Sequence, residues 1–137
     1  MIPLHFLYWE GQNMDIFEAC KSYESRIAYQ KKVIDSNKRI AIKGSEAGVS
    51  NEIMKTLLQD VQKSEAKLTE MELENIRNVS DLKDLLDQNI HDERIRYILQ
   101  LKYILKFNNE QIADEVGLSC SYVGKLITKG KNMVLKG

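Results

Sequence analysis

The sequence predicts an all-α protein in which a long antiparallel helical hairpin, coiled-coil-like in its apolar pattern, precedes a smaller domain of shorter helices. The only Pro among the 137 residues is Pro3, so no later position forbids helix by ring chemistry. Lys, Glu, Leu, Ile, Gln and Asp dominate the composition, which favours helices over strands. Apolar residues also recur every three or four positions along most of the chain, which is the spacing of one helix face.

We expect three parts: a leader over residues 1–14, the hairpin over residues 15–90 and the C-terminal domain over residues 91–137. The opening segment Met1–Trp9 is apolar but has no basic lead-in and no cleavage site, so it is a poor signal peptide and is too short to span a bilayer. Either Met14 is the natural start, or residues 1–13 dock on the core; the sequence leaves both open.

The first long helix is expected from Asp15 to about Lys43, a stretch without Gly or Pro. Polar side chains fill the gaps in its heptad-like apolar seam, which consists of Ile16, Cys20, Tyr23, Ile27, Gln30, Ile34, Asn37 and Ala41. The segment Lys43–Ser50 contains two Gly and two Ser, and is expected to end the helix.

The second long helix is expected to begin near Asn51, with Ser50 or Asn51 as its cap. No Gly or Pro occurs from residue 49 to residue 116, so the run is one long helix, or two with a break at residues 78–80. Its seam consists of Ile53, Leu57, Val61, Ser64, Leu68, Met71, Asn75, Val79, Leu82 and Leu86. Two such runs joined by a short loop predict an antiparallel hairpin.

Some apolar residues lie off this seam, namely Leu58, Leu73, Ile76 and Leu85. Two helices give each other only one narrow stripe, so these side chains need a further partner. We therefore expect a homo-oligomer. The alternative is a monomer whose C-terminal helices fold back on the hairpin.

The C-terminal part predicts a helix-turn-helix. Asp92 is suited to cap a first helix, and residues 106–109 supply a turn. In the segment Asn109–Thr128, four features have the required offsets: a small residue, a turn glycine, apolar core positions and a cap for the second helix. These features are carried by Ala113, Gly117, the core set Ile112, Val116, Leu118, Val123 and Leu126, and Ser119.

In a helix-turn-helix the second helix enters the major groove of duplex DNA. With the core positions assigned, the expected DNA-binding residues are Ser119, Ser121, Tyr122, Lys125, Thr128, Lys129 and Lys131. Ser121, Tyr122, Lys125 and Thr128 are placed to reach base edges or phosphates. Lys125 and Lys129 are expected to neutralise phosphates, and Lys131 is expected to extend that surface. No Arg occurs in this helix, so the commonest specific contact to guanine is missing there.

Charge and chemistry support a binding protein rather than an enzyme. Residues 1–90 hold 12 Lys or Arg and 15 Asp or Glu, a net of −3, whereas residues 91–137 hold 8 and 5, a net of +3. No nucleophile elbow, phosphate-binding loop, metal-ligand set or paired carboxylates is recognisable, so we expect no catalytic site, metal or cofactor. Cys20 and Cys120 form no CxxC motif and are expected to be reduced thiols in a cytoplasmic protein without a membrane partner.

Three segments, Ile95–Tyr103, Glu110–Ser119 and Tyr122–Leu126, resemble the fourth region of bacterial sigma factors. The whole layout resembles small phage and prophage regulators of late genes of the ArpU/RinA type. This resemblance implies a transcriptional regulator that acts near a promoter and contacts RNA polymerase. The chain departs from sigma factors because it has no second-region segment and no run of Arg in the recognition helix.

The leading hypothesis is thus a phage- or prophage-encoded regulator that binds double-stranded DNA as a homo-oligomer. A second hypothesis is a sigma-like module that binds RNA polymerase or another protein with little DNA contact, which the missing Arg favours. A third is a phage DNA-packaging subunit, although such proteins usually place the DNA-binding part first. Selection from random duplex DNA separates the first hypothesis from the other two.

Overall fold

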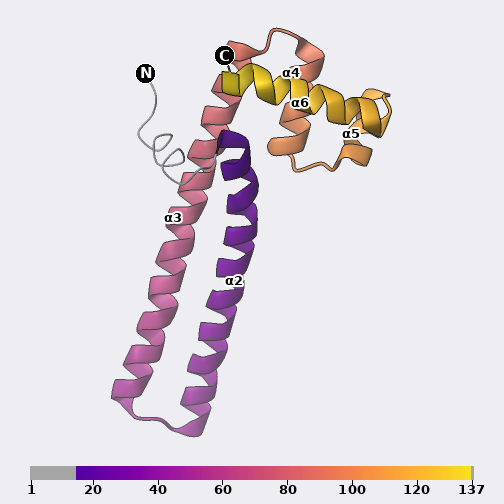
Figure 1. Cartoon of the computed structure of the whole chain (residues 1–137). Helices are drawn as coiled ribbons and strands as arrows, with labels where there is room; N and C mark the ends of the chain where they lie inside the picture. The colour runs from indigo at the N-terminus through magenta and orange to yellow at the C-terminus, as the bar shows by residue number, and fades with distance from the viewer. Residues whose placement is uncertain (1–14, 137) are drawn as a thin grey trace. The chain divides into compact units, whose positions relative to one another are not determined.

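A computed structural model describes residues 15–136 of the chain. This part contains five helices and no strand, which confirms the expected all-α class (Figure 1). The helices are α2 (Ile16–Ala47), α3 (Asn51–Asn89), α4 (Glu93–Tyr103), α5 (Asn109–Val116) and α6 (Cys120–Lys136). The leader expected over residues 1–14 lies outside the described residues.

The chain divides into two compact units. One, the C-terminal unit, combines residues 15–21 with residues 77–136. The other, the long-helix unit, is the segment Ser22–Ile76. The first turns of α2 and the last turns of α3 therefore belong to the same unit as α4, α5 and α6.

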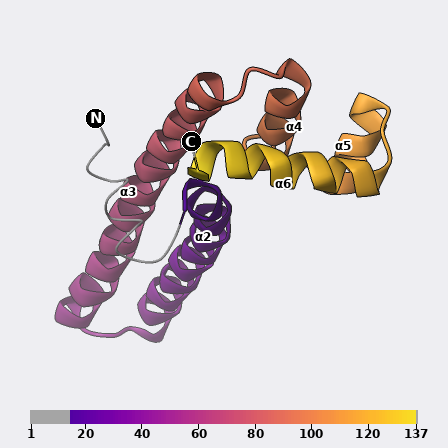
Figure 2. The same cartoon turned by 45° about the horizontal axis from the view of Figure 1, so that its top comes forward.

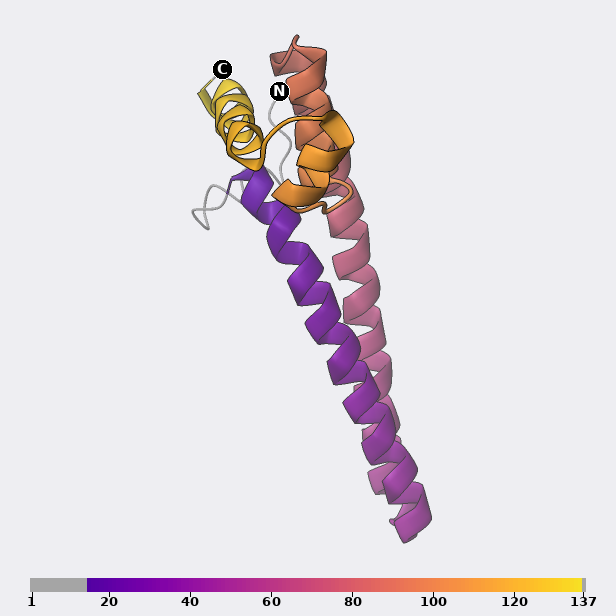
Figure 3. The ribbon, with the colours of Figure 1, turned by 90° about the vertical axis from the view of Figure 1, so that its right-hand side faces the viewer.

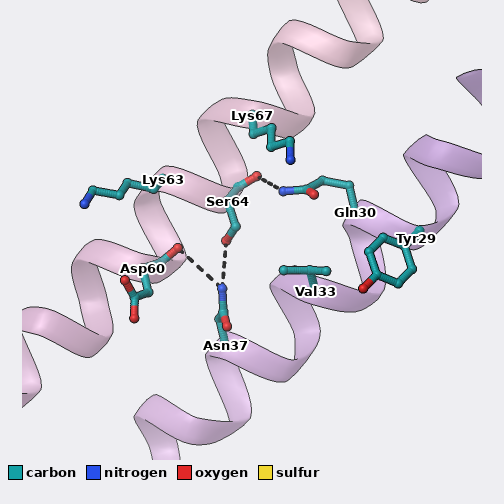
Figure 4. A pocket seen from close by; sticks show the side chains of 8 residues that line it. All are labelled: Tyr29, Gln30, Val33, Asn37, Asp60, Lys63, Ser64 and Lys67. Carbon is teal, nitrogen blue, oxygen red and sulfur yellow. Dashed lines mark hydrogen bonds between the residues drawn. The ribbon is translucent and has the colours of Figure 1, made fainter.

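In the long-helix unit, α2 and α3 lie side by side and run in opposite directions (Figures 1 and 3). The apolar residues buried there are Tyr23, Ile34, Ala41 and Val61. Polar side chains fill the rest: Gln30 Nε2 donates a hydrogen bond to the Ser64 carbonyl at 2.9 Å. Asn37 Nδ2 donates to Ser64 Oγ at 3.3 Å and lies 3.5 Å from the Asp60 carbonyl (Figure 4). The polar interruptions of the predicted seam thus hydrogen-bond to the opposite helix.

A surface groove of about 350 Å³ runs beside these hydrogen bonds. Figure 4 shows its lining residues, which come from both helices of the unit: Tyr29, Gln30, Val33, Asn37, Asp60, Lys63, Ser64 and Lys67. Its lining is mixed in charge, and the polar groups at its base already bond to one another.

Helix α2 ends inside the segment Lys43–Ser50 that was predicted to end it, although a few residues beyond the expected end near Lys43. The helix continues through Gly44 to Ala47. A Cβ atom added at Gly44 would lie 2.9 Å from the Leu57 Cδ1 atom of α3. Gly44 therefore serves the close approach of the two helices, which outweighs its low helix propensity.

The turn between the two long helices is short. Gly48 has a φ of +70°, a left-handed conformation that favours glycine. Ser50 Oγ accepts a hydrogen bond from the Ile53 amide at 3.3 Å, so Ser50 caps α3 as predicted. The helix then runs unbroken over Asn51–Asn89, so the alternative break at residues 78–80 is absent.

The C-terminal unit has a continuous apolar core. Helices α4, α5 and α6 contact one another pairwise, and Figure 2 shows α6 passing across both α4 and α5. The start of α2 and the end of α3 complete the core, whose fully buried members include Ile16, Phe17, Leu82, Leu86, Ile90, Ile95, Ile98, Leu99, Ile112 and Val123. These side chains are apolar, and Asn78 is the one polar residue among the largest fully buried side chains of the described residues, so the unit is stabilised mainly by apolar burial.

The four off-seam residues have different environments. Leu85 packs against the core of the C-terminal unit, which gives it a partner within the chain. Leu58, Leu73 and Ile76 are 50, 51 and 64% exposed. None of the helices in residues 15–136 has the length and apolar character needed to cross a membrane.

Candidate nucleic-acid interface

The two helices that pack against α6, namely α4 and α5, both begin at a capping side chain. The Asp92 carboxylate accepts hydrogen bonds from the backbone amides of Arg94 at 2.9 Å and Ile95 at 3.2 Å, which confirms Asp92 as the cap of α4. Asn108 caps α5 in a reciprocal capping box with Gln111. The sequence interpretation treated this segment only as a turn. An Asn followed three residues later by Gln is the pattern that could have predicted the box.

The turn between α5 and α6 has the predicted chemistry. Gly117 has a φ of +69° and donates its amide to the Ala113 carbonyl at 2.9 Å. The Leu118 amide donates to the same carbonyl at 3.1 Å. Ser119 Oγ accepts from the Tyr122 amide at 3.1 Å, so Ser119 caps α6. The turn therefore satisfies backbone groups on both sides without a contribution from any other element.

The core faces of α5 and α6 also agree with the sequence. Ile112 and Val123 are fully buried, and Ala113 and Leu126 are nearly so. Val116 and Leu118 are half-buried and pack against the core.

Gly130 lies where α6 packs closely against α4, a role that the sequence did not predict. A Cβ atom at Gly130 would lie 2.6 Å from Leu99 Cδ1 and 2.8 Å from Ile95 Cγ2, both on α4. Gly130 therefore sets how closely α6 approaches α4. Gly124, which the sequence singled out as odd in a helix interior, has only Asn109 Nδ2 near its Cβ position, at 3.9 Å. No close approach requires a glycine there.

Six of the seven expected DNA-binding residues are exposed: Ser119, Ser121, Tyr122, Lys125, Thr128 and Lys129. Because successive helix residues are about 100° apart, the five from Ser121 onward share one face of α6. Thr128 Oγ1 donates to the Gly124 carbonyl at 3.1 Å, so its hydroxyl proton is already used within the helix. The face thus presents two ammonium groups, two hydroxyls and the Tyr122 phenol.

Lys131 has a different environment from the other lysines. Its Nζ atom lies 5.7 Å from the centre of the Phe17 ring and 5.9 Å from that of Tyr103. These two rings pack together with centroids 4.9 Å apart. Lys131 is half-buried over this aromatic pair and is about 240° round the helix from Lys125, so it does not extend the exposed face.

Arg94 is the functional candidate that sequence reasoning missed. Its Nη2 atom lies 3.5 Å from Tyr122 OH, and its guanidinium carbon lies 5.7 Å from the centre of the Tyr122 ring. An arginine from α4 thus joins the exposed face of α6. The sequence prediction covered only residues at the second helix of the motif. No local pattern links positions 28 residues apart, so the sequence alone does not indicate this contact.

The charges on α5 and α6 have opposite signs. Helix α6 carries four lysines and no acid. Helix α5 carries Glu110, Asp114 and Glu115, all exposed, and no base. The Tyr97 phenol of α4 donates to Glu115 Oε1 at 3.1 Å, and this hydrogen bond raises the pKa of Tyr97. The exposed side of α5 is therefore suited to a positively charged partner, and that of α6 to a negatively charged one.

Two lysines of the C-terminal unit donate hydrogen bonds to other segments of the unit and do not belong to the exposed face of α6. Lys102 Nζ donates to Asn109 Oδ1 at 2.8 Å, and burial lowers the pKa of Lys102, with the charges of Lys21 and Lys131 adding to the effect. Lys106 has a φ of 63°, rare for a residue with a side chain, and its Nζ donates to the Cys20 carbonyl at 2.8 Å.

The two cysteines have contrasting environments. Burial raises the pKa of the Cys20 thiol to about 11, so this group stays a neutral thiol at physiological pH. Cys120 is exposed at the first position of α6. Among the described residues no group of three His, Cys, Asp or Glu is arranged to hold a metal ion.

The chain matches no family model, no curated protein and no solved structure at a significant level.

Proposed function

We propose that the protein is a transcriptional regulator that binds duplex DNA, with α5 and α6 as a helix-turn-helix and α6 as the recognition helix. The observation that carries this proposal is the single exposed face of α6, on which Ser121, Tyr122, Lys125, Thr128 and Lys129 gather. A helix of 17 residues is about 25 Å long, enough to lie along a major groove.

The arrangement of polar groups suits a nucleic acid. Lys125 and Lys129 are exposed one turn apart, the spacing at which two ammonium groups can follow a phosphate backbone. The hydroxyls of Ser121 and Tyr122 lie nearer the start of α6, the part of a recognition helix that contacts base edges. In this assignment phosphate contacts set the orientation, and the start of α6 carries the sequence preference.

The proposal extends to assembly and context. Leu58, Leu73 and Ile76 are exposed in the long-helix unit, and we attribute their exposure to contacts between copies of the chain. A homo-oligomer would place two recognition helices on paired half-sites, which offsets the small number of base contacts from one copy. A phage or prophage origin and contact with RNA polymerase follow only from the resemblance to sigma-like regulators, and a cytoplasmic location follows from the two cysteines outside any CxxC motif.

The test is selection of bound sequences from random duplex DNA at near-physiological salt, followed by affinity measurements on the selected site. Lys125→Ala and Lys129→Ala should each weaken binding to every duplex and lower the salt slope by about 1, because each removes a phosphate contact. The control is Lys83→Ala, which removes an exposed lysine from α3. Equal effects of all three substitutions, or no binding by the wild-type protein, would refute the assignment.

A second candidate function is a module that binds another protein, and the three exposed carboxylates of α5 favour it. A basic protein surface complements Glu110, Asp114 and Glu115, whereas DNA repels them. If random duplex DNA yields no enriched sequence, a pull-down with purified RNA polymerase becomes the decisive measurement. Charge reversal at Asp114 and Glu115 should then abolish capture, while Lys125→Ala should leave it unchanged.

A further inference from the structure

The exposed face of α6 includes a cation that does not come from α6. Arg94 is the second residue of α4, and its backbone is held in place because its amide donates to the Asp92 carboxylate at 2.9 Å. From this fixed position its side chain reaches Tyr122, with Nη2 3.5 Å from the phenol oxygen and the guanidinium carbon 5.7 Å from the ring centre. A capped helix end and a cation–ring contact together define where this guanidinium lies.

The guanidinium has capacity left for a ligand. Arginine has five N–H donors, and only the one toward Tyr122 OH is engaged by a side chain here. Among residues 15–136, no carboxylate forms an ion pair with Arg94. The contrast is Arg96, whose Nη1 donates to the Ile90 carbonyl at 2.9 Å and whose Nε lies 3.8 Å from Asp87. Arg96 is used within the fold, whereas Arg94 is exposed.

We propose that Arg94 and Tyr122 act as one DNA-contacting pair, in which α4 supplies the base-contacting arginine that α6 lacks. This inference rests on the proposed function, because it assigns a specificity-determining residue to that same face. Arg94 lies against the Tyr122 side chain near the start of α6, the part of the helix assigned to base edges. A planar guanidinium there can donate two parallel hydrogen bonds to the O6 and N7 atoms of guanine.

The pairing also restricts Tyr122. Tyr122 is 41% exposed, and an unsupported phenol at that exposure would sample several rotamers. The contact with Arg94 favours one of them before DNA arrives, which lowers the entropy lost on binding. Substitution of either residue should therefore change the sequence preference at the same base positions.

The experiment begins with the wild-type protein and its selected DNA site. Arg94→Ala should weaken binding to that site by about tenfold and leave binding to unrelated duplex nearly unchanged, because it removes a base contact. Its selected sequences should lose preference at the positions that Tyr122→Ala also affects. Arg94→Lys keeps the charge but not the planar fork, so it should preserve the salt slope without restoring the preference.

The matched control is Arg39→Ala, which removes an exposed arginine from the long-helix unit. Far-UV circular dichroism and the unfolding midpoint verify the fold of each variant, and Arg94→Gln repeats the test should the alanine variant unfold. Arg94 variants that behave like Arg39→Ala, or that weaken binding to all duplexes equally, would overturn the inference while the proposed function stands. No DNA binding by the wild-type protein would overturn both.

Discussion

The two compact units of this chain use different side chains to hold helices together. In the C-terminal unit, every large fully buried side chain except Asn78 is apolar, and segments from five helices contribute. In the long-helix unit only two helices meet, and Gln30 and Ser64 are buried among a few apolar residues. The difference follows from geometry, because two helices can enclose only a narrow stripe whereas several helices enclose a volume.

This contrast bears on what each unit can do. A small polar surface needs rigid support to bind a partner, and the exposed face of α6 has such support in the apolar core behind it, where Val123, Leu126 and Gly130 are buried. The polar seam contributes less free energy but defines which residues of α2 and α3 face one another. The Gln30 amide donates to the Ser64 carbonyl, and the Asn37 amide donates to Ser64 Oγ and lies near the Asp60 carbonyl. The apolar core of the C-terminal unit thus contributes mainly to stability, whereas the polar seam of the long-helix unit mainly determines the register of α2 and α3.

The largest expected effect tests the core directly. Ile98→Ala should lower the free energy of unfolding by about 3–5 kcal/mol, because Ile98 is fully buried among several helices. Ile34→Ala, in the two-helix seam, should cost about 2 kcal/mol because its surroundings can close over the lost methylenes. Urea titration followed by circular dichroism measures both. Equal costs would show that the two units are packed alike.

A smaller effect concerns the approach of α6 to α4. Gly130→Ala should destabilise the protein by about 1–2 kcal/mol, since the new methyl group would lie 2.6 Å from Leu99 Cδ1 while helix propensity returns part of the loss. Gly124→Ala is the control and should stabilise the protein by about 0.5–1 kcal/mol, because its Cβ position is open. Thermal unfolding distinguishes the two variants. A stabilising effect of Gly130→Ala would mean that the Leu99 and Ile95 side chains of α4 can shift to accommodate the methyl group.

The smallest effect tests the seam. Gln30→Ala should lower the free energy of unfolding by about 1 kcal/mol, the net value of one hydrogen bond. Gln30→Leu should be neutral or slightly stabilising, because the apolar side chain replaces a desolvated amide. Equilibrium unfolding of the two variants at matched salt gives the comparison. A large loss with Gln30→Leu would show that the amide contributes more to stability than to register.

Local patterns in the sequence predicted the features that depend on local chemistry. Ser50, Asp92 and Ser119 cap helices as predicted, and Gly117 has the left-handed conformation that its place in the turn required. These features depend on residues within four positions of one another, which a single sequence displays directly.

Features that depend on packing between distant segments could not be predicted from local sequence patterns. The contact of Arg94 with Tyr122 joins two helices, and the need for glycine at position 130 arises only because Leu99 lies opposite. The prediction for Lys131 counted charge along the sequence and not the rotation around α6, which turns that side chain toward Phe17 and Tyr103. Helix α2 continues past Gly44, where Leu57 of α3 occupies the space that a Cβ atom would need.

The hydrogen bond from Lys106 to the Cys20 carbonyl joins positions 86 residues apart in the sequence. The C-terminal unit is therefore discontinuous, and Ser22–Ile76 is an insertion between its two pieces. During synthesis the first turns of α2 leave the ribosome long before their partners, so this core cannot close until α6 has been made. Because loop-closure entropy grows only slowly with length, the long separation in sequence adds little to the entropic cost of bringing the two pieces of the C-terminal unit together.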